Sequence, residues 1–376
     1  MRGSPTPLRL GYACAWWHPR EQTWSYSAVR LRQALAAHAT VLDIEAQRSL
    51  AGKAILRALC LPQRELPWQY CQTERRLIDR AVRRGVSRAL PEAVLGIGEV
   101  DTVSEAPTFF YQDTSAAAIL AYQAESGLPY TNLLPCRRDV LERWAAQQGE
   151  RDGRAAAVFT MSRWYRDFLV GTFRIPPERI VVIPPGVNNP PTVYRDPERP
   201  SAGRVLFVGT DFAVKAGDVV VEAVRRLRRG GDGDVRLTVV GPDRWPLPGK
   251  LPDFVDFRGP LPAAEVSALY AVHDVLAMPS RYEGFGIVLA EALVAGLPCV
   301  ARRAFAMPEI VEEGITGALV DSEDADELAV ALASLLGDPE IFSRVAAARV
   351  ELSSRFDWNT AARLMVEHMT HVVRGD

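Results

Sequence analysis

Short apolar runs alternate with longer amphipathic segments along most of this chain. Runs such as 8–15, 41–44 and 93–97 have the length and continuity of buried strands, whereas residues 26–37 repeat their apolar side chains at helical spacing. The later runs of the first half are 108–111, 156–160 and 180–183. Strands that alternate with helices in this order predict a parallel sheet with right-handed crossovers.

One segment in the middle of the chain breaks this alternation. Pro184 to Gly203 reads PPGVNNPPTVYRDPERPSAG; it is rich in proline, glycine and asparagine and has no periodicity, which is typical of a linker. A second series of strand-like runs follows it, namely VLFVG, LTVVG, VDFRG, VLAMPS and PCVA. The chain has 376 residues, more than the roughly 250–300 that one hydrophobic core usually holds. We therefore predict two doubly wound α/β halves, with ligands at the carboxyl ends of the strands.

Composition and charge narrow the class of protein. Hydrophobic residues make up 48% of the chain and charged residues 24%, and the net charge of −2 gives no reason to expect a nucleic-acid partner. No stretch approaches the roughly 18 apolar residues of a membrane span, and the N-terminus lacks the apolar core of a signal peptide. The five cysteines are scattered without a CxxC pair, which favours thiols in a reducing compartment. We expect a cytoplasmic protein without integral membrane contact. The sequence does not indicate its oligomeric state.

The region 48–92 is locally basic. It holds ten Lys/Arg against four Asp/Glu, a net charge of +6. Two interpretations stay open: a solvated helical face, or a face for peripheral contact with anionic lipid. No sustained apolar stripe accompanies the basic residues, which favours the solvated face.

The residues most informative about chemistry are 278–300, MPSRYEGFGIVLAEALVAGLPCV. Glu283 and Glu291 stand eight positions apart, with a Gly-Phe-Gly turn between them and a helix-like run behind the turn. Glycines let a backbone approach a ligand closely, and the N–H groups of a helix N-terminus suit phosphate or sugar oxygens. A glutamate two turns inside the helix can hold a polyol such as ribose. This arrangement predicts a nucleotide-sugar site.

The ordered pattern resembles that of the retaining glycosyltransferases of GT-B fold, family 4 type. The shared elements are Pro279, Ser280, Glu283, Gly284, Phe285, Gly286, Glu291, Ala295, Gly296 and Pro298. The resemblance implies two Rossmann-like domains facing a central cleft. It implies an acceptor-binding domain over 1–186, a linker over 187–203, a nucleotide-sugar domain over 204–355, and a terminal helix over 356–376 that returns to the first domain.

In this family the second domain holds the donor. The positions that the resemblance assigns to the donor are Gly209, Thr210, Lys215, Gly241, Arg258, Glu283, Gly284, Phe285, Gly286, Ile287 and Glu291. Lys215, one of only three lysines, would neutralise the diphosphate, while Glu283 would hold the transferred sugar and Glu291 the ribose. Relatives usually pair this lysine with an arginine, and the two positions concerned are Thr210 and Val214 here. The candidates to replace it are Arg281, Arg302, Arg303 or a residue of the other domain.

The acceptor side departs further from the family. The first loop carries Trp17, His18 and Trp24 where relatives usually have a Gly-Gly pair. The resemblance assigns these side chains to the acceptor, with packing of the tryptophans against the core as the alternative. A later strand ends in Gln112 and Asp113, where relatives commonly place a histidine or a His-Asp pair, and the resemblance assigns both residues to the acceptor as well. The resemblance therefore keeps a carboxylate, Asp113, near the reacting centre.

Together these features imply a retaining hexosyltransferase that needs no metal and no cofactor, and whose catalytic residues are Lys215, Glu283 and Asp113. The donor base (UDP, GDP, dTDP or ADP) stays open, as do the sugar and the hydroxyl acceptor. His368 and His371 stand three apart without a third ligand nearby in sequence, so we expect no metal there. The alternatives are a nucleotide-sugar-binding protein without activity and a pseudo-glycosyltransferase that uses a cyclitol.

Overall fold

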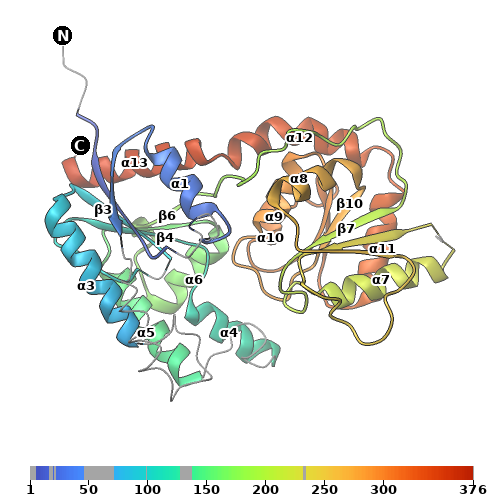
Figure 1. Ribbon diagram of the computed structural model, residues 1–376, viewed down its shortest axis with the longest axis horizontal. Coiled ribbons are helices and arrows are strands. Elements are labelled where there is room, and N and C mark those ends of the chain that lie inside the picture. The colour runs from blue at the N-terminus through green and yellow to red at the C-terminus, as the bar shows by residue number, and fades with distance from the viewer. Residues whose placement is uncertain are drawn as a thin grey trace, which may run out of the picture. The chain divides into compact units, whose positions relative to one another are not determined.

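The computed structural model describes residues 6–16, 20, 23–45, 72–98, 100–127, 138–231 and 234–375. The chain divides into two compact units (Figure 1). The first consists of Met1–Asn188 together with Asp357–Asp376, and the second of Asn189–Phe356. Each unit is a parallel sheet covered by helices, so the prediction of two α/β halves is confirmed.

The sheet of the first unit has the strand order β2-β1-β3-β4-β5-β6. Its strands are β1 (Arg9–Cys14), β2 (Thr40–Glu45), β3 (Ala93–Ile97), β4 (Thr108–Gln112), β5 (Ala157–Thr160) and β6 (Ile180–Val182). Its helices are α1 (Ser27–Leu35), α3 (Gln72–Ala89), α4 (Ala116–Ser126), α5 (Arg138–Arg154), α6 (Arg163–Phe173) and α13 (Trp358–Arg374). The order of the strands reverses between β1 and β3, which is where doubly wound sheets usually bind ligands.

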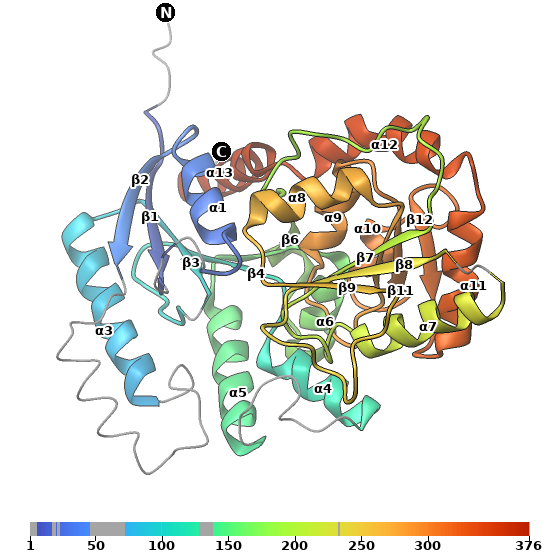
Figure 2. The same cartoon turned by 45° about the vertical axis from the view of Figure 1, so that its right-hand side comes forward.

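The sheet of the second unit has the order β12-β11-β10-β7-β8-β9. Its strands are β7 (Arg204–Val208), β8 (Arg236–Val240), β9 (Val255–Gly259), β10 (Val275–Met278), β11 (Cys299–Arg302) and β12 (Gly317–Val320). Its helices are α7 (Gly217–Arg229), α8 (Ala263–Val272), α9 (Ile287–Val294), α10 (Met307–Ile310), α11 (Ala325–Leu336) and α12 (Ile341–Arg355). Here the order reverses between β7 and β10, and Figure 2 shows α7 and α11 covering one face of the sheet.

The proline-rich segment 189–203 is bound to the second unit by a buried arginine. The guanidinium of Arg195 lies 3.2 Å from Asp274 and stacks on the ring of Phe342. Asp274 also accepts hydrogen bonds from the backbone N–H groups of Ala202 and Arg204, both at 2.9 Å. Burial lowers the pKa of Arg195, which its ion pair with Asp274 partly offsets. The segment that has the composition of a linker is thus packed against the second unit and held there by the ion pair of Arg195 with Asp274.

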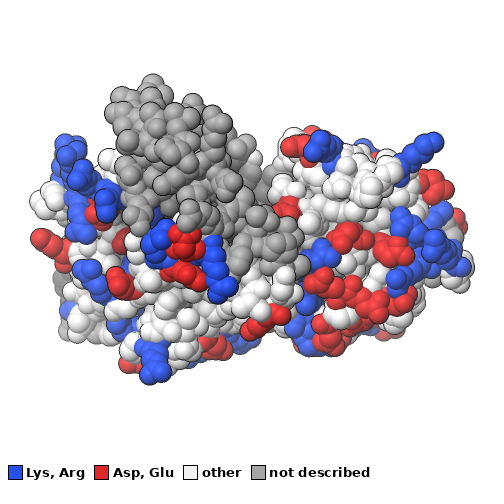
Figure 3. Space-filling view, turned by 90° about the horizontal axis from the view of Figure 1, so that it is seen from below, with Lys and Arg blue, Asp and Glu red and all other residues white. Residues whose placement is uncertain are grey.

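The terminal helix α13 belongs to the first unit, where it packs on α1. The indole N–H of Trp358 donates to Asn188 at 3.0 Å, and the amide of Asn188 donates to the hydroxyl of Ser27 at 3.0 Å. Among the described residues, no helix is long and apolar enough to cross a membrane. On the face seen in Figure 3, basic and acidic side chains intermingle over much of the described surface.

Candidate functional site

Two loops of the second unit that carry candidate donor residues meet because β7 and β10 are neighbours in its sheet. The loop after β7 carries Gly209 to Lys215, and the loop after β10 carries Pro279 to Gly286. Parallel neighbours end at the same edge, so both loops lie where the strand order reverses. The fold therefore brings together two segments that are about seventy residues apart in sequence.

Lys215 and Glu283 form an ion pair at this edge. The ammonium Nζ lies 2.7 Å from the carboxylate Oε2, and the side chains are 24% and 11% exposed. The hydroxyl of Ser280 donates to the same oxygen at 3.2 Å. Two residues that the sequence assigned to opposite ends of one reaction are therefore in direct contact, and partial burial strengthens the attraction between them.

Two glycines are required by the backbone around this pair. Gly241 has a φ of +127°, and a Cβ there would lie 2.3 Å from the carbonyl oxygen of Gly209. Gly286 has a φ of +99° and precedes α9, whose N-terminus has no side-chain cap. Only glycine adopts such angles without strain, so the turn leaves backbone N–H groups of Ile287 and its neighbours available to oxygen ligands.

Glu291 lies one residue past the middle of α9 and is buried, with 8% of its surface exposed. Its Oε2 accepts from the hydroxyl of Tyr270 at 3.3 Å, and its Oε1 from the backbone N–H of Asn189 at 3.4 Å. Burial, and then the charge of Glu291, raises the pKa of Tyr270 well above its usual range. These long hydrogen bonds hold the carboxylate in place while leaving it capacity for further donors.

The two positions at which relatives carry the arginine paired with the lysine are Thr210 and Val214 in this chain. Thr210 is exposed and Val214 is buried. Arg281 makes two hydrogen bonds to Asp218, of 2.7 and 2.8 Å, and one of 2.7 Å to Glu323. The three candidate arginines are all held by carboxylates: Arg281 by Asp218 and Glu323, Arg302 by Glu323, and Arg303 by Glu313 and Asp321.

Arg281 instead fastens the lysine loop. Its backbone N–H donates to the carbonyl of Val214 at 2.8 Å, and its guanidinium donates to the carbonyl of Ala213 at 2.5 Å. Its hydrogen bonds to Asp218 raise its pKa, so it is a fixed cation. Arg281 thereby connects the two loops of the site, the one that carries Lys215 and the one that carries Glu283.

Arg258, the candidate for contact with the base, lies at the end of β9. It pairs with Asp256 at 2.7 Å and is about half exposed. Nearby, Trp245 packs edge-on against Phe257 and Phe212, with ring centres 5.9 and 6.1 Å apart. The guanidinium of Arg258 is therefore at the surface and held by its own strand.

In the first unit, Gln112 is turned into the protein. Its amide Nε2 donates to Asp152 at 3.0 Å, and its Oε1 accepts from the hydroxyl of Tyr165 at 3.1 Å. The residue is 7% exposed. Both polar ends of the side chain are thus occupied by protein partners, which gives Gln112 a supporting place at the end of β4.

The other acceptor candidates are only partly described. Asp113 follows Gln112 and is half-buried, and its charge adds to burial in raising the pKa of Tyr111. Trp24 has a φ of +50° and packs edge-on against Tyr111 at 5.7 Å. Trp17 and His18 lie outside the described residues. The structure thus brings Trp24 close to the strand that carries Gln112 and Asp113.

Two findings concern possible metal ligands. Among the described residues no group of three His, Cys, Asp or Glu side chains could hold a metal ion. His368 is partly buried and packs edge-on against Phe109 and Phe159.

Four supporting residues of these sites carried no sequence signal of that role. Tyr270 and Asp152 sit on helices at ordinary helical positions, and Asn189 lies in the linker-like segment. Arg281 was considered only as a phosphate ligand, since nothing in the sequence reveals that Asp218 faces it. Contacts between elements far apart in sequence supply this information, and spacing along the chain does not.

The comparisons with known proteins agree with this geometry. Residues 202–338 match the family model described as glycosyl transferases group 1. The D-inositol 3-phosphate glycosyltransferase of Thermobispora bispora is 31% identical over 224 residues, which cover 52% of this chain and 51% of the relative. The protein of the same name from Paenarthrobacter aurescens is 31% identical over 253 residues, 61% of each chain. The chain spans about half the length of the curated relatives it matches.

Solved structures resemble nearly the whole chain. Sucrose-phosphate synthase from Thermosynechococcus elongatus superposes with a TM-score of 0.72 at 17% identity, covering 98% of this chain and 100% of that one. Anabaena HepE, solved with UDP and glucose, gives 0.66 at 16% identity, covering 96% and 99%. These neighbours have the GT-B fold. The chain therefore has the GT-B fold, and within its second unit residues 202–338 match the family of glycosyl transferases group 1.

Proposed function

We propose that this protein is a retaining, metal-independent glycosyltransferase that moves a sugar from a nucleotide-diphosphate donor to a hydroxyl acceptor. The observation that carries the proposal is the contact of Lys215 with Glu283 where the strand order of the second unit reverses. One cation and one carboxylate at a glycine-lined helix N-terminus suit a diphosphate next to a sugar.

In the proposed reaction the bond between the anomeric carbon and the diphosphate oxygen breaks. The acceptor oxygen forms its bond to the same face of that carbon, and its proton passes to the departing phosphate. Lys215 exchanges Glu283 for the diphosphate and stabilises the charge that develops on it. Glu283, once released, accepts hydrogen bonds from hydroxyls of the transferred sugar, and Glu291 accepts from the ribose. Asp113 of the first unit orients the acceptor.

The names of the relatives guide the choice of substrates. Several relatives are named for inositol 3-phosphate, and one structural neighbour was solved with UDP and glucose. We therefore propose a UDP-sugar donor and a hydroxylated, phosphorylated acceptor as the first pair to test. Cys14 and Cys299 are buried and form no disulfide, which fits the cytoplasm, where nucleotide sugars are available.

A second candidate is a nucleotide-sugar-binding protein without activity. It is favoured by Thr210 and Val214, which stand where relatives carry an arginine, because one lysine leaves a diphosphate partly uncompensated. This candidate predicts saturable binding of a nucleotide sugar without release of the nucleotide.

Calorimetry with UDP, GDP, dTDP and ADP, followed by turnover assays, tests the proposal. UDP-glucose and UDP-N-acetylglucosamine are offered with D-inositol 3-phosphate, with and without EDTA, and the product anomer is read by NMR. We expect EDTA-resistant release of UDP and an α-linked product from an α-linked donor. Inversion of the anomer or loss of activity in EDTA contradicts the mechanism. Binding without turnover across a panel of acceptors selects the second candidate.

A further inference from the structure

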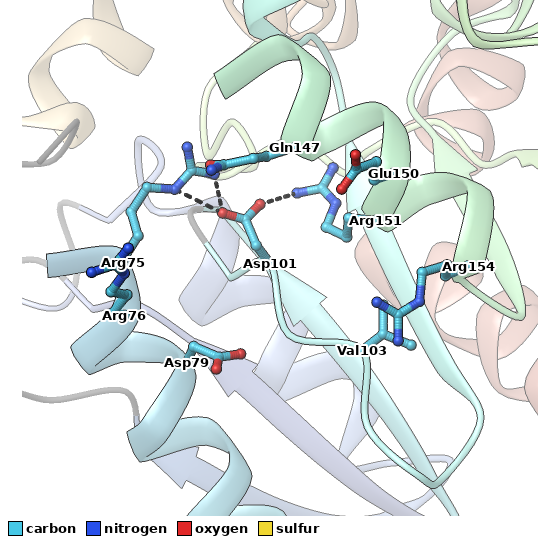
Figure 4. A pocket seen from close by; sticks show the side chains of 9 residues that line it. All are labelled: Arg75, Arg76, Asp79, Asp101, Val103, Gln147, Glu150, Arg151 and Arg154. Carbon is cyan, nitrogen blue, oxygen red and sulfur yellow. Dashed lines mark hydrogen bonds and ion pairs between the residues drawn. The ribbon is translucent and has the colours of Figure 1, made fainter. Parts of the chain in front are cut away.

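A chain of buried polar contacts crosses the first unit from its surface to the end of β4. Arg75 on α3 donates through Nε to Asp101 at 2.9 Å, and Arg151 on α5 donates through Nη1 to the other oxygen of Asp101 at 3.0 Å. Figure 4 shows the two arginines approaching Asp101 from opposite sides, in a pocket of about 330 Å³ between α3 and α5. Arg151 is 3% exposed, and it continues inward to Asp152.

Asp152 is the inner end of this chain of contacts. One of its oxygens, Oδ1, accepts from Arg151 Nε at 2.8 Å and from Gln112 Nε2 at 3.0 Å. The other, Oδ2, is buried without a hydrogen-bond partner among the described residues. The whole carboxylate is inaccessible to solvent, and burying a charged group costs free energy. Asp152 is nevertheless buried with only one of its two oxygens hydrogen-bonded.

Stability alone does not account for this arrangement. A buried ion pair recovers little more than the desolvation of its charges, and an apolar replacement of similar size often stabilises as well. The neighbouring residues of the core are apolar, and the guanidinium of Arg151 already stacks on the ring of Phe110 at 4.5 Å. The contribution of Asp152 is to fix the side-chain amide of Gln112 in one orientation.

We infer that Asp152 is a positioning residue for the acceptor. It holds Gln112, and with Tyr165 it fixes the carboxyl end of β4, from which Asp113 extends. This inference rests on the proposed function, since it requires an acceptor at this end of the sheet. Gln112 itself contacts no acceptor, because both ends of its amide are occupied by protein groups.

The hydrogen bond and the charge of Asp152 can be separated by two substitutions. Asp152→Asn retains an oxygen at the Oδ1 position and places its amide nitrogen where Oδ2 has no partner, so it keeps the contact with Gln112. Asp152→Leu keeps four side-chain heavy atoms with the same branching, although its methyl groups are larger than the oxygens, and it removes the contact. With UDP-glucose and D-inositol 3-phosphate, or the panel acceptor that gives turnover, we expect Asp152→Leu to lower kcat/KM for the acceptor about 10- to 100-fold. Asp152→Asn should remain close to the wild type.

Two further measurements show that the effect passes through Gln112 and concerns the acceptor. Gln112→Leu should reproduce the defect, and the double variant with Asp152→Leu should be no worse than either single variant. Binding of UDP and the slow hydrolysis of UDP-glucose without acceptor should be unchanged in all of them. Asp167→Asn, which removes an exposed carboxylate of α6, is the matched control.

Several outcomes overturn the inference. An equal loss of donor hydrolysis and of transfer, additive effects in the double variant, or wild-type kinetics in Asp152→Leu each contradict a positioning role. If Asp152→Leu does not fold, the same comparison on Gln112→Leu decides, and an unchanged KM for the acceptor there is contrary evidence. A wild-type protein that binds UDP but transfers nothing overturns the proposed function together with this inference. An active wild type with unaffected variants overturns the inference alone.

Discussion

The two units use their charged side chains in opposite ways. At the point of strand reversal in the second unit, Lys215 and Glu283 form a partly buried ion pair, and we propose that this pair opens to a ligand. At the end of β4 in the first unit, Gln112 and Asp152 are turned inward and are joined by a buried hydrogen bond. The comparison teaches that a partly accessible ion pair can exchange one partner for a ligand, whereas a buried carboxylate fixes the orientation of the side chain that it contacts.

The largest expected effect comes from exchanging the members of the surface ion pair. Lys215→Ala should lower kcat about 100- to 1000-fold, as loss of a group that stabilises the leaving charge usually does. The double variant Lys215→Glu with Glu283→Lys keeps an ion pair but moves the cation. It should have a near-normal Tm and no measurable transfer.

Steady-state kinetics and thermal unfolding of the three proteins separate the two roles of the pair. Recovery of turnover in the exchanged variant would mean that the pair is needed for stability and does not contact the donor. A normal kcat in Lys215→Ala would sink the catalytic assignment.

A second prediction concerns Glu291 and donor binding. Glu291→Gln should weaken UDP binding about 5-fold, because a hydrogen bond to a charged acceptor contributes roughly 1 kcal/mol more than one to a neutral acceptor. Calorimetry with UDP measures the effect, and Tyr270→Phe is the control, since it removes the hydroxyl that contacts Glu291 and keeps the carboxylate. Equal losses in the two variants would show that Glu291 acts through its contact with Tyr270.

A third prediction addresses the acceptor side. Trp24→Ala removes the edge contact with Tyr111 and should raise the KM for the acceptor several-fold, while Trp24→Phe keeps an aromatic edge and should change little. Neither variant should alter UDP binding by calorimetry. A change in UDP affinity would contradict the proposed division of roles, in which the second unit binds the donor and the first unit binds the acceptor.

The smallest expected effect is a dependence of stability on pH that both units share. Burial lowers the pKa of His273 in the second unit and of His368 in the first. Their neutral forms are favoured in the folded state, so the stabilisation is complete above the unfolded pKa of about 6.5 and is lost as pH falls below it. His273→Gln and His368→Gln should each flatten the decline of Tm between pH 7.5 and 5.5, by no more than about 4 °C. A decline of unchanged steepness in His273→Gln would contradict the burial argument for that residue.

Much of the fold followed from sequence because apolar periodicity is a local property. The strand expected at 93–97 is found as Ala93–Ile97, and the run expected at 156–160 begins one residue later, at Ala157. The contact of Lys215 with Glu283 also had a basis in sequence, since each follows a strand and strand order brings the two ends together. In contrast, the inward turn of Gln112 depends on Asp152, forty residues away on a helix with no distinguishing pattern. Packing between distant elements decides such orientations, and sequence spacing does not contain it.

The buried arginine of the proline-rich segment has a practical consequence for dissecting the molecule. A fragment that begins at residue 204 would look reasonable by composition, yet it would remove Arg195 and leave the fully buried Asp274 without that guanidinium. A fragment spanning 189–356 retains the pair, as well as the contact of Asn189 with Glu291. Anyone who wishes to study nucleotide binding in isolation should therefore cut the chain fifteen residues earlier than its proline content advises.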